Sequence, residues 1–275
     1  MLAHYETKKV PILMYHSISE HASPKFKPFA VPPALFAEHM AYLHRHAYTP
    51  ITVTRFVRVR LKSPSALPER PVILTFDDGF ADFFTGAFPV LTRYGFPATL
   101  YITTAFIDST SRWMQHEGEG TRSMLTWRQL IEISAAGVEC GGHTHRHPQL
   151  DTLPLAKARE EIQLSKRLLE DRLSQEVCSF AYPYGYHSAA IKRLVQEAGY
   201  TSACAVKYEM SSEISDPFAL GRLIVKPDTD IDAFSALLNS RYPSAAAALY
   251  KRARVPVWRL VRRSSTWRIQ QREDR

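Results

Sequence analysis

Residues 72–79 read Val-Ile-Leu-Thr-Phe-Asp-Asp-Gly, and this stretch decides the fold. Its first five residues form a continuous, mostly apolar run with β-branched side chains. A short run of this kind is typical of a strand covered on both faces, as the strands of parallel sheets are. The stretch therefore predicts a parallel sheet with Asp77 and Asp78 at the end of one strand.

On both sides of this strand, short apolar runs alternate with segments of helical spacing. The expected strands cover residues 10–15, 72–76, 98–103, 138–140, 178–181, 201–206 and 223–225. The expected helices cover residues 34–45, 88–94, 126–136, 155–173 and 188–198. Strands and helices in this alternation build βα units. About seven of them predict an α/β fold, a distorted (β/α)7-type barrel of mostly parallel strands in a single domain.

Charge is distributed unevenly along the 275 residues. From Arg241 to the end there are ten Lys and Arg residues against two acidic ones, so this part alone accounts for the net charge of +8. We expect residues 1–238 to form the domain and residues 239–275 to form a basic C-terminal tail. The neutral body argues against a nucleic-acid partner.

Cellular location is predicted from what the chain lacks. The first residues show no signal-peptide pattern, and no apolar segment is long enough to span a bilayer. We therefore expect a cytoplasmic protein with its three cysteines reduced and buried. Residues 245–272 mix tryptophan with arginine, which fits peripheral contact with the anionic inner face of the membrane or, alternatively, a solvated tail. The sequence does not predict the oligomeric state.

Three expected strands end in residues that can do chemistry. Asp77 and Asp78 follow one strand, His143 and His147 follow another, and His16 follows the first. The carboxyl ends of parallel strands meet at one mouth of a barrel, so these side chains should converge. Two imidazoles and one carboxylate leave an open coordination position, as catalytic Zn²⁺ sites do. Taken alone, the aspartate pair could also be a helix cap, and the two histidines are weak evidence of a metal.

The same residues resemble a known family. Residues 75–79 read Thr-Phe-Asp-Asp-Gly, residues 143–148 read His-Thr-His-Arg-His-Pro, and residues 180–185 read Phe-Ala-Tyr-Pro-Tyr-Gly. This series resembles the motifs of the polysaccharide deacetylases, which carry the NodB homology domain and form carbohydrate esterase family 4. Residues 14–18, Met-Tyr-His-Ser-Ile, look most like the branch that deacetylates poly-N-acetylglucosamine.

The resemblance implies roles for the residues at the metal. Asp78, His143 and His147 would bind a divalent cation, most simply Zn²⁺. Asp77 would be the general base, and His16 would be the acid that protonates the departing amine. His16 could alternatively be a packed core residue.

The resemblance also implies three contacts with the substrate. The backbone N–H of Tyr184 would stabilise the oxyanion, and Tyr182 and Trp127 would shape the sugar pocket. The implied activity is hydrolysis of a carbon–nitrogen bond that is not a peptide bond. It would remove N-linked acetyl groups from an N-acetylated sugar or polysaccharide during cell-envelope or exopolysaccharide biosynthesis.

Two departures from the family pattern affect this hypothesis. The third motif usually begins with an arginine that pairs with the catalytic aspartate, and here that position is Ala181. Without a cation nearby, burial and the metal would set the pKa of Asp77, unless Arg146 or Lys226 takes the place of the arginine. The late Leu-x-His motif is also missing. Alternative functions are therefore a deacylase for an N-formyl, O-acetyl or small amide substrate and a catalytically idle, metal-bearing glycan-binding protein.

Overall fold

The computed structural model describes residues 8–62, 66–206, 209–212 and 214–239. Its strands are β1 (Lys9–Val10), β2 (Ile12–Tyr15), β3 (Ser17–Ile18), β4 (Ala30–Val31), β5 (Thr49–Pro50), β6 (Pro71–Phe76), β7 (Thr99–Ile102), β8 (Glu139–Gly142), β9 (Ser179–Ala181), β10 (Ser202–Cys204), β11 (Ser211–Ser212) and β12 (Leu223–Ile224). Its α-helices are α1 (Pro33–Arg45), α2 (Val53–Lys62), α3 (Phe88–Tyr94), α4 (Trp127–Ala135), α5 (Leu155–Leu173), α6 (Ala189–Glu197) and α7 (Ile231–Leu238).

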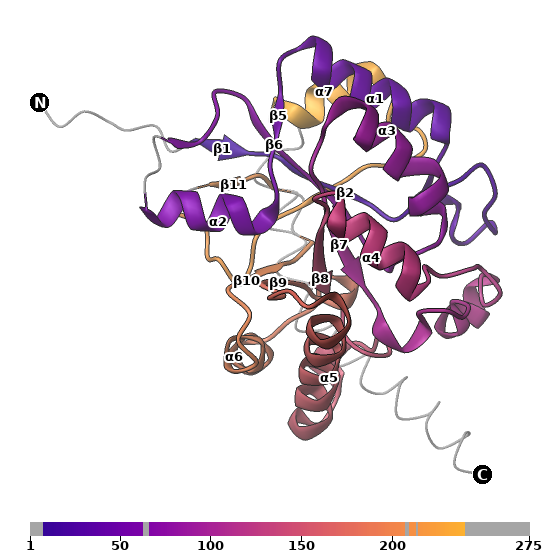
Figure 1. Cartoon of the computed structure of the whole chain (residues 1–275), viewed down its shortest axis with the longest axis vertical. Helices are drawn as coiled ribbons and strands as arrows, with labels where there is room; N and C mark the ends of the chain where they lie inside the picture. Colours follow the sequence, from indigo (N-terminus) through magenta and orange to yellow (C-terminus); the bar gives the residue numbers. More distant parts are fainter. Residues whose placement is uncertain (1–7, 63–65, 207–208, 213, 240–275) are drawn as a thin grey trace, which may run out of the picture.

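Eight of these strands form one parallel sheet in the order β10-β9-β8-β7-β6-β2-β12, with β5 paired to the start of β6. The sheet curls into a half-barrel with helices around it (Figure 1). An isolated parallel bridge joins Cys204, in β10, to Leu220, just ahead of β12. The two edges of the sheet therefore approach each other, and the predicted single-domain α/β barrel of mostly parallel strands is confirmed.

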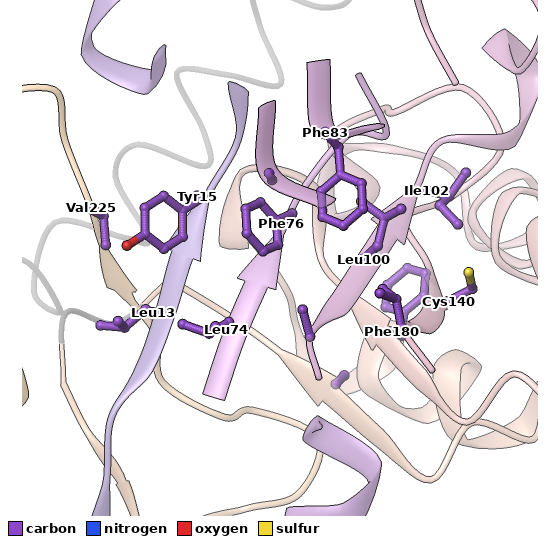
Figure 2. Packing of buried hydrophobic residues seen from close by; sticks show 14 of the residues in the cluster. Leu13, Tyr15, Leu74, Phe76, Phe83, Leu100, Ile102, Cys140, Phe180 and Val225 are labelled. Carbon is purple, nitrogen blue, oxygen red and sulfur yellow. The ribbon is translucent and has the colours of Figure 1, made fainter. Parts of the chain in front are cut away.

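The core lies in two layers. The larger layer packs the outer face of the sheet against the helices, and Figure 2 shows part of it, with Leu13, Leu74, Leu100 and Phe180 contributed by neighbouring strands. The smaller layer fills the inside of the curl and includes Tyr101, Ala181 and Cys204. All three cysteines are buried and free, as expected.

Local signals account for the helix ends. Thr126 caps α4 in a capping box with Gln129, and Ser188 caps α6 through Ile191 N–H. Gly95 ends α3 with a φ of 63°, in the left-handed region where glycine has no steric penalty. The sequence did not predict α2 or α7.

The first expected strand is two strands. Pro11 has no N–H, so the ladder is interrupted there: β1 pairs antiparallel with β11, and β2 pairs parallel with β6. The strand expected to end at Cys140 continues through Gly141 and Gly142. Side chains do not fit at these two positions, because a Cβ would lie 2.6 Å from Tyr101 at Gly141 and 2.1 Å from the Tyr200 hydroxyl at Gly142.

Within residues 8–239, none of the described helices has the length and apolarity needed to cross a membrane. The basic tail predicted for residues 239–275 lies almost entirely outside the described residues. Its boundary, its contact with a membrane through residues 245–272 and the cytoplasmic location stay predictions.

Candidate active site

Asp77 and Asp78 come directly after β6, at the end of the sheet where the carboxyl ends of β6 and β2 lie side by side. Asp77 N–H donates to Tyr15 O at 3.0 Å, which extends the pairing of these two strands by one residue. Asp78 has a φ of +76°, a conformation that costs an L-residue free energy and that is found at functional sites. Both carboxylates are buried, with 3% and 4% of their surface exposed.

Asp78, His143 and His147 converge as the sequence predicted. Asp78 Oδ1 lies 3.5 Å from His143 Nε2 and 3.2 Å from His147 Nε2, and the two Nε2 atoms are 3.2 Å apart. All three ligand atoms lie within 4.8 Å of one another. His145 turns elsewhere, with its Nδ1 3.0 Å from Thr104 Oγ1.

His143 and His147 lie in the loop after β8 and are held by hydrogen bonds to β9 and to the loop itself. His143 Nδ1 lies 2.7 Å from the carbonyl oxygen of Ala181, which can only accept, so Nδ1 donates and Nε2 is the ring nitrogen that faces Asp78. His147 has a φ of +60°, and its N–H donates to Thr144 Oγ1 at 2.9 Å. These hydrogen bonds fix the ring of His143 and the backbone of His147, and the two rings face each other through their Nε2 atoms.

These three side chains fit a divalent metal. Asp78 Oδ1 is buried and has no hydrogen-bond partner among the described residues, as expected of an atom prepared for a cation. Burial raises the pKa of the Asp78 carboxyl, but His147 and His143 together hold it well below its usual value. The carboxylate is therefore charged at neutral pH. One carboxylate and two imidazoles are a ligand set of catalytic zinc sites.

Asp77 pairs with an arginine that the sequence did not predict. Arg222 comes directly before β12, is fully buried, and donates from Nη1 and Nη2 to the two carboxylate oxygens of Asp77 at 2.6 and 2.7 Å. Arg222 also donates to Thr75 Oγ1 at 3.3 Å and lies over the ring of Tyr101 at 5.5 Å. Burial raises the pKa of Asp77, but Arg222 and then His143 lower it below its ordinary value.

The expectation that no cation lies beside Asp77 is therefore wrong, and so is the alternative that Arg146 or Lys226 pairs with it. Arg146 pairs with Glu161 at 3.7 Å on the surface. The small side chain of Ala181 lies in the same inner layer as Tyr101, on which Arg222 packs. One signal could have revealed Arg222: it is the only charged residue in the stretch 217–225, and a charge in such a run is buried only when it is paired.

His16 lies at the end of β2, beside the cluster. Its ring packs on Phe29 with centroids 5.0 Å apart, and its Nδ1 is buried without a hydrogen-bond partner among the described residues. The pKa of His16 is below its ordinary value, because burial lowers it by more than the charges of Asp78 and Asp77 raise it. The structure thus places His16 close to both aspartates, in the one-residue break between β2 and β3.

Aromatic side chains contact the cluster through His147. His147 is flanked by Tyr184 at 4.8 Å and by Trp113 at 5.5 Å between ring centroids. Tyr182 is fully buried and donates its hydroxyl to Phe218 O at 3.0 Å. Trp127 lies at the start of α4, with the Arg172 guanidinium 5.5 Å from its ring. Tyr182 and Trp127 thus have packing contacts, and their place in a sugar pocket stays a prediction.

A family model described as polysaccharide deacetylase matches residues 65–203, which include Asp77, Asp78, His143 and His147. The chain belongs to the polysaccharide deacetylase family. It is therefore a hydrolase of the deacetylase class, and the resemblance seen in its motifs is confirmed.

Two related sequences and one solved structure agree with this assignment. The polysaccharide-deacetylase homologue YxkH of Bacillus subtilis is 30% identical over 84% of this chain and 77% of its own length. The poly-beta-1,6-N-acetyl-D-glucosamine N-deacetylase of Staphylococcus epidermidis is 25% identical over 86% of this chain and 80% of its own length. Among solved structures, Streptococcus pyogenes deacetylase PplD, in complex with acetate, has a TM-score of 0.73 and 26% identity over 86% of this chain and 100% of its own length.

Proposed function

We propose that this deacetylase is metal-dependent and removes acetyl groups from the nitrogen atoms of an N-acetylated polysaccharide. The observation that carries the proposal is the buried triplet Asp78, His143 and His147, with the Asp77–Arg222 pair directly beside it. A triplet of ligands needs one more group to complete a tetrahedral metal, and that group can be water or substrate.

A divalent metal bound there would activate a water molecule and polarise the acetyl carbonyl. Asp77 is proposed as the general base that accepts a proton from the attacking water. Arg222 keeps its carboxylate charged and fixes both oxygens, so Asp77 is prepared before the substrate arrives. The free lone pairs of Asp77 remain available for the proton.

His16 is proposed as the acid on another side of the site. It would donate a proton to the amide nitrogen as the carbon–nitrogen bond breaks, so that an amine and acetate leave. The N–H of Tyr184 is proposed to donate to the oxyanion. The next two N–H groups, those of Gly185 and Tyr186, bond instead to Tyr182 O and Pro183 O, at 2.8 and 3.3 Å.

Zn²⁺ is the proposed metal, because imidazole nitrogens and a carboxylate oxygen in a compact triplet suit it better than they suit Mg²⁺ or Ca²⁺. The proposed substrate class is a polymer of N-acetylated hexosamine. Its support is the name of the Staphylococcus epidermidis relative, which spans most of this chain. A role in cell-envelope or exopolysaccharide biosynthesis follows from that substrate class.

The test is acetate release by the full-length protein, stripped of metal and then reloaded with Zn²⁺, Mg²⁺ or nothing. The substrates are oligomers of N-acetylglucosamine, an O-acetylated sugar and an N-formylated sugar. We expect Zn²⁺ to restore release, with the N-acetylated oligomers turned over fastest. Equal release without metal would refute metal dependence, and faster turnover of the O-acetyl or N-formyl sugar would refute the substrate class.

A further inference from the structure

Trp113 stands out among the residues to which the proposed function gives no role. It lies in a short 3-10 helix, Arg112–Glu117, in the connection between β7 and α4. Its ring contacts His147, a proposed metal ligand, with centroids 5.5 Å apart, and the ring of Tyr184 contacts the same histidine at 4.8 Å. Trp113 is partly buried, and Tyr184 is 50% exposed. Two aromatic surfaces thus border the same ligand.

Other aromatic rings pack against the indole of Trp113. Its indole packs against Phe106 at 4.5 Å and lies nearly parallel to Phe80, with a centroid distance of 6.2 Å and an interplanar angle of 15°. Phe80 and Phe26 belong to a small buried cluster, separate from the two core layers. The indole is therefore fixed in one orientation, and an ordered aromatic surface binds a ligand at a small cost in entropy.

Arg122 joins the connection that carries Trp113 to other parts of the chain by hydrogen bonds. Its guanidinium lies over the rings of Phe26 and Phe80, at 5.2 and 5.6 Å from their centroids. It donates to Asp82 Oδ2 at 3.0 Å, to Glu119 Oε2 at 2.9 Å and to His21 O at 2.7 Å. These acceptors come from three parts of the chain: the loop after the aspartate pair, the connection between β7 and α4 that carries Trp113 (the Trp113 segment), and the loop after β3.

We propose that Trp113 is a specificity residue, on whose indole the sugar ring that carries the reacting acetamido group stacks. This inference rests on the proposed function, because the metal triplet determines where the acetamido group lies. One bond joins that group to its sugar ring, so the ring must lie close to the metal ligands, as Trp113 does. One face of a pyranose presents C–H groups, which complement the negative face of an indole.

The alternative is that Trp113 only supports His147 by packing. The two roles separate in a binding experiment with the full-length Asp77→Asn variant loaded with Zn²⁺, because this variant should bind substrate without turning it over. The dissociation constant of an N-acetylglucosamine tetramer is measured by calorimetry, and Zn²⁺ affinity is measured by competition with a chelator. Both are repeated after adding Trp113→Leu, Trp113→Phe or Trp127→Leu, with Tyr94→Leu as a remote aromatic control.

We expect Trp113→Leu to weaken tetramer binding by about five- to tenfold, the scale of one aromatic stacking contact. Trp113→Phe should have a smaller effect, and Zn²⁺ affinity should not change in either variant. Unchanged tetramer binding, or a parallel loss of Zn²⁺ affinity, would overturn the inference and leave the proposed function standing. If Trp127→Leu weakened binding instead, the sugar would stack on the other tryptophan. If the parent bound Zn²⁺ but no tetramer, both proposals would fall.

Discussion

Replacing Arg222 by methionine would leave the Asp77 carboxylate buried without its cation. The pair is 0% and 4% exposed at the side chains, and both of its hydrogen bonds are charge-assisted. Removal of one partner from such a pair typically destabilises a protein by about 3–5 kcal/mol, because the remaining charge cannot be solvated. We expect a loss of this size in the free energy of unfolding of the metal-free Arg222→Met variant at pH 7.

The loss should depend on pH in a defined direction. In the native protein the pKa of Asp77 is below its ordinary value, so the stability it contributes is lost as the pH falls through the folded-state pKa. Without Arg222, burial should raise that pKa above the unfolded-state value. The variant should then lose stability as the pH rises between the two values, and its deficit should shrink toward pH 4.

The assay is urea unfolding followed by circular dichroism at pH 7, 5.5 and 4.5. Asp77→Asn with Arg222→Met forms the double-mutant cycle, because no buried carboxylate remains in it. It should recover a large part of the loss at pH 7. If Arg222→Met were as stable as the parent, or if its deficit did not depend on pH, Arg222 would not hold the charge of Asp77 as described.

Three further predictions concern residues around the site. His39 is buried between Tyr15 and Thr229 O, and burial lowers its pKa to about 4. As the pH falls, the unfolded chain therefore binds a proton at His39 before the folded protein does, so the free energy of unfolding should fall by about 3 kcal/mol from pH 7 to pH 4. His39→Gln should remove this part of the pH dependence in the same urea assay. Gly142→Ala should cost about 1–3 kcal/mol in thermal unfolding by pushing on Tyr200, and adding Tyr200→Phe should recover part of it; no recovery would contradict the packing argument. Arg122→Lys should raise KM for N-acetylglucosamine oligomers several-fold, because a lysine cannot donate to all three acceptors of the planar guanidinium. A KM equal to that of the parent would show that the Trp113 segment does not need these hydrogen bonds.

Much of the fold follows from short-range patterns. The helix Leu155–Leu173 was predicted to the residue, because its apolar stripe is long and regular. The convergence of Asp78, His143 and His147 also follows from the sequence, since parallel strands bring their carboxyl ends together wherever they lie in the chain. The strand was predicted to end before the two glycines of β8, because only the folded protein shows the rings of Tyr101 and Tyr200 occupying the space that side chains would need there.

Short-range sequence patterns could not predict the Asp77–Arg222 pair. The two residues are 145 positions apart, so no spacing joins them. The family pattern directed attention to Ala181, but the guanidinium enters from the segment before β12 instead. In the same way, Trp113 lies in an irregular connection without periodicity, and its contact with His147 exists only in three dimensions.

The most direct test of the account compares Asp77→Asn with Asp78→Asn in the full-length protein. Zn²⁺ binding is measured by chelator competition, and acetate release is measured with N-acetylglucosamine oligomers. The account predicts that Asp77→Asn binds Zn²⁺ but releases less acetate by a factor of at least about 10², the scale of a general base, whereas Asp78→Asn loses both properties. Full release by Asp77→Asn, or undiminished Zn²⁺ binding by Asp78→Asn, would contradict the assignment of base and ligand.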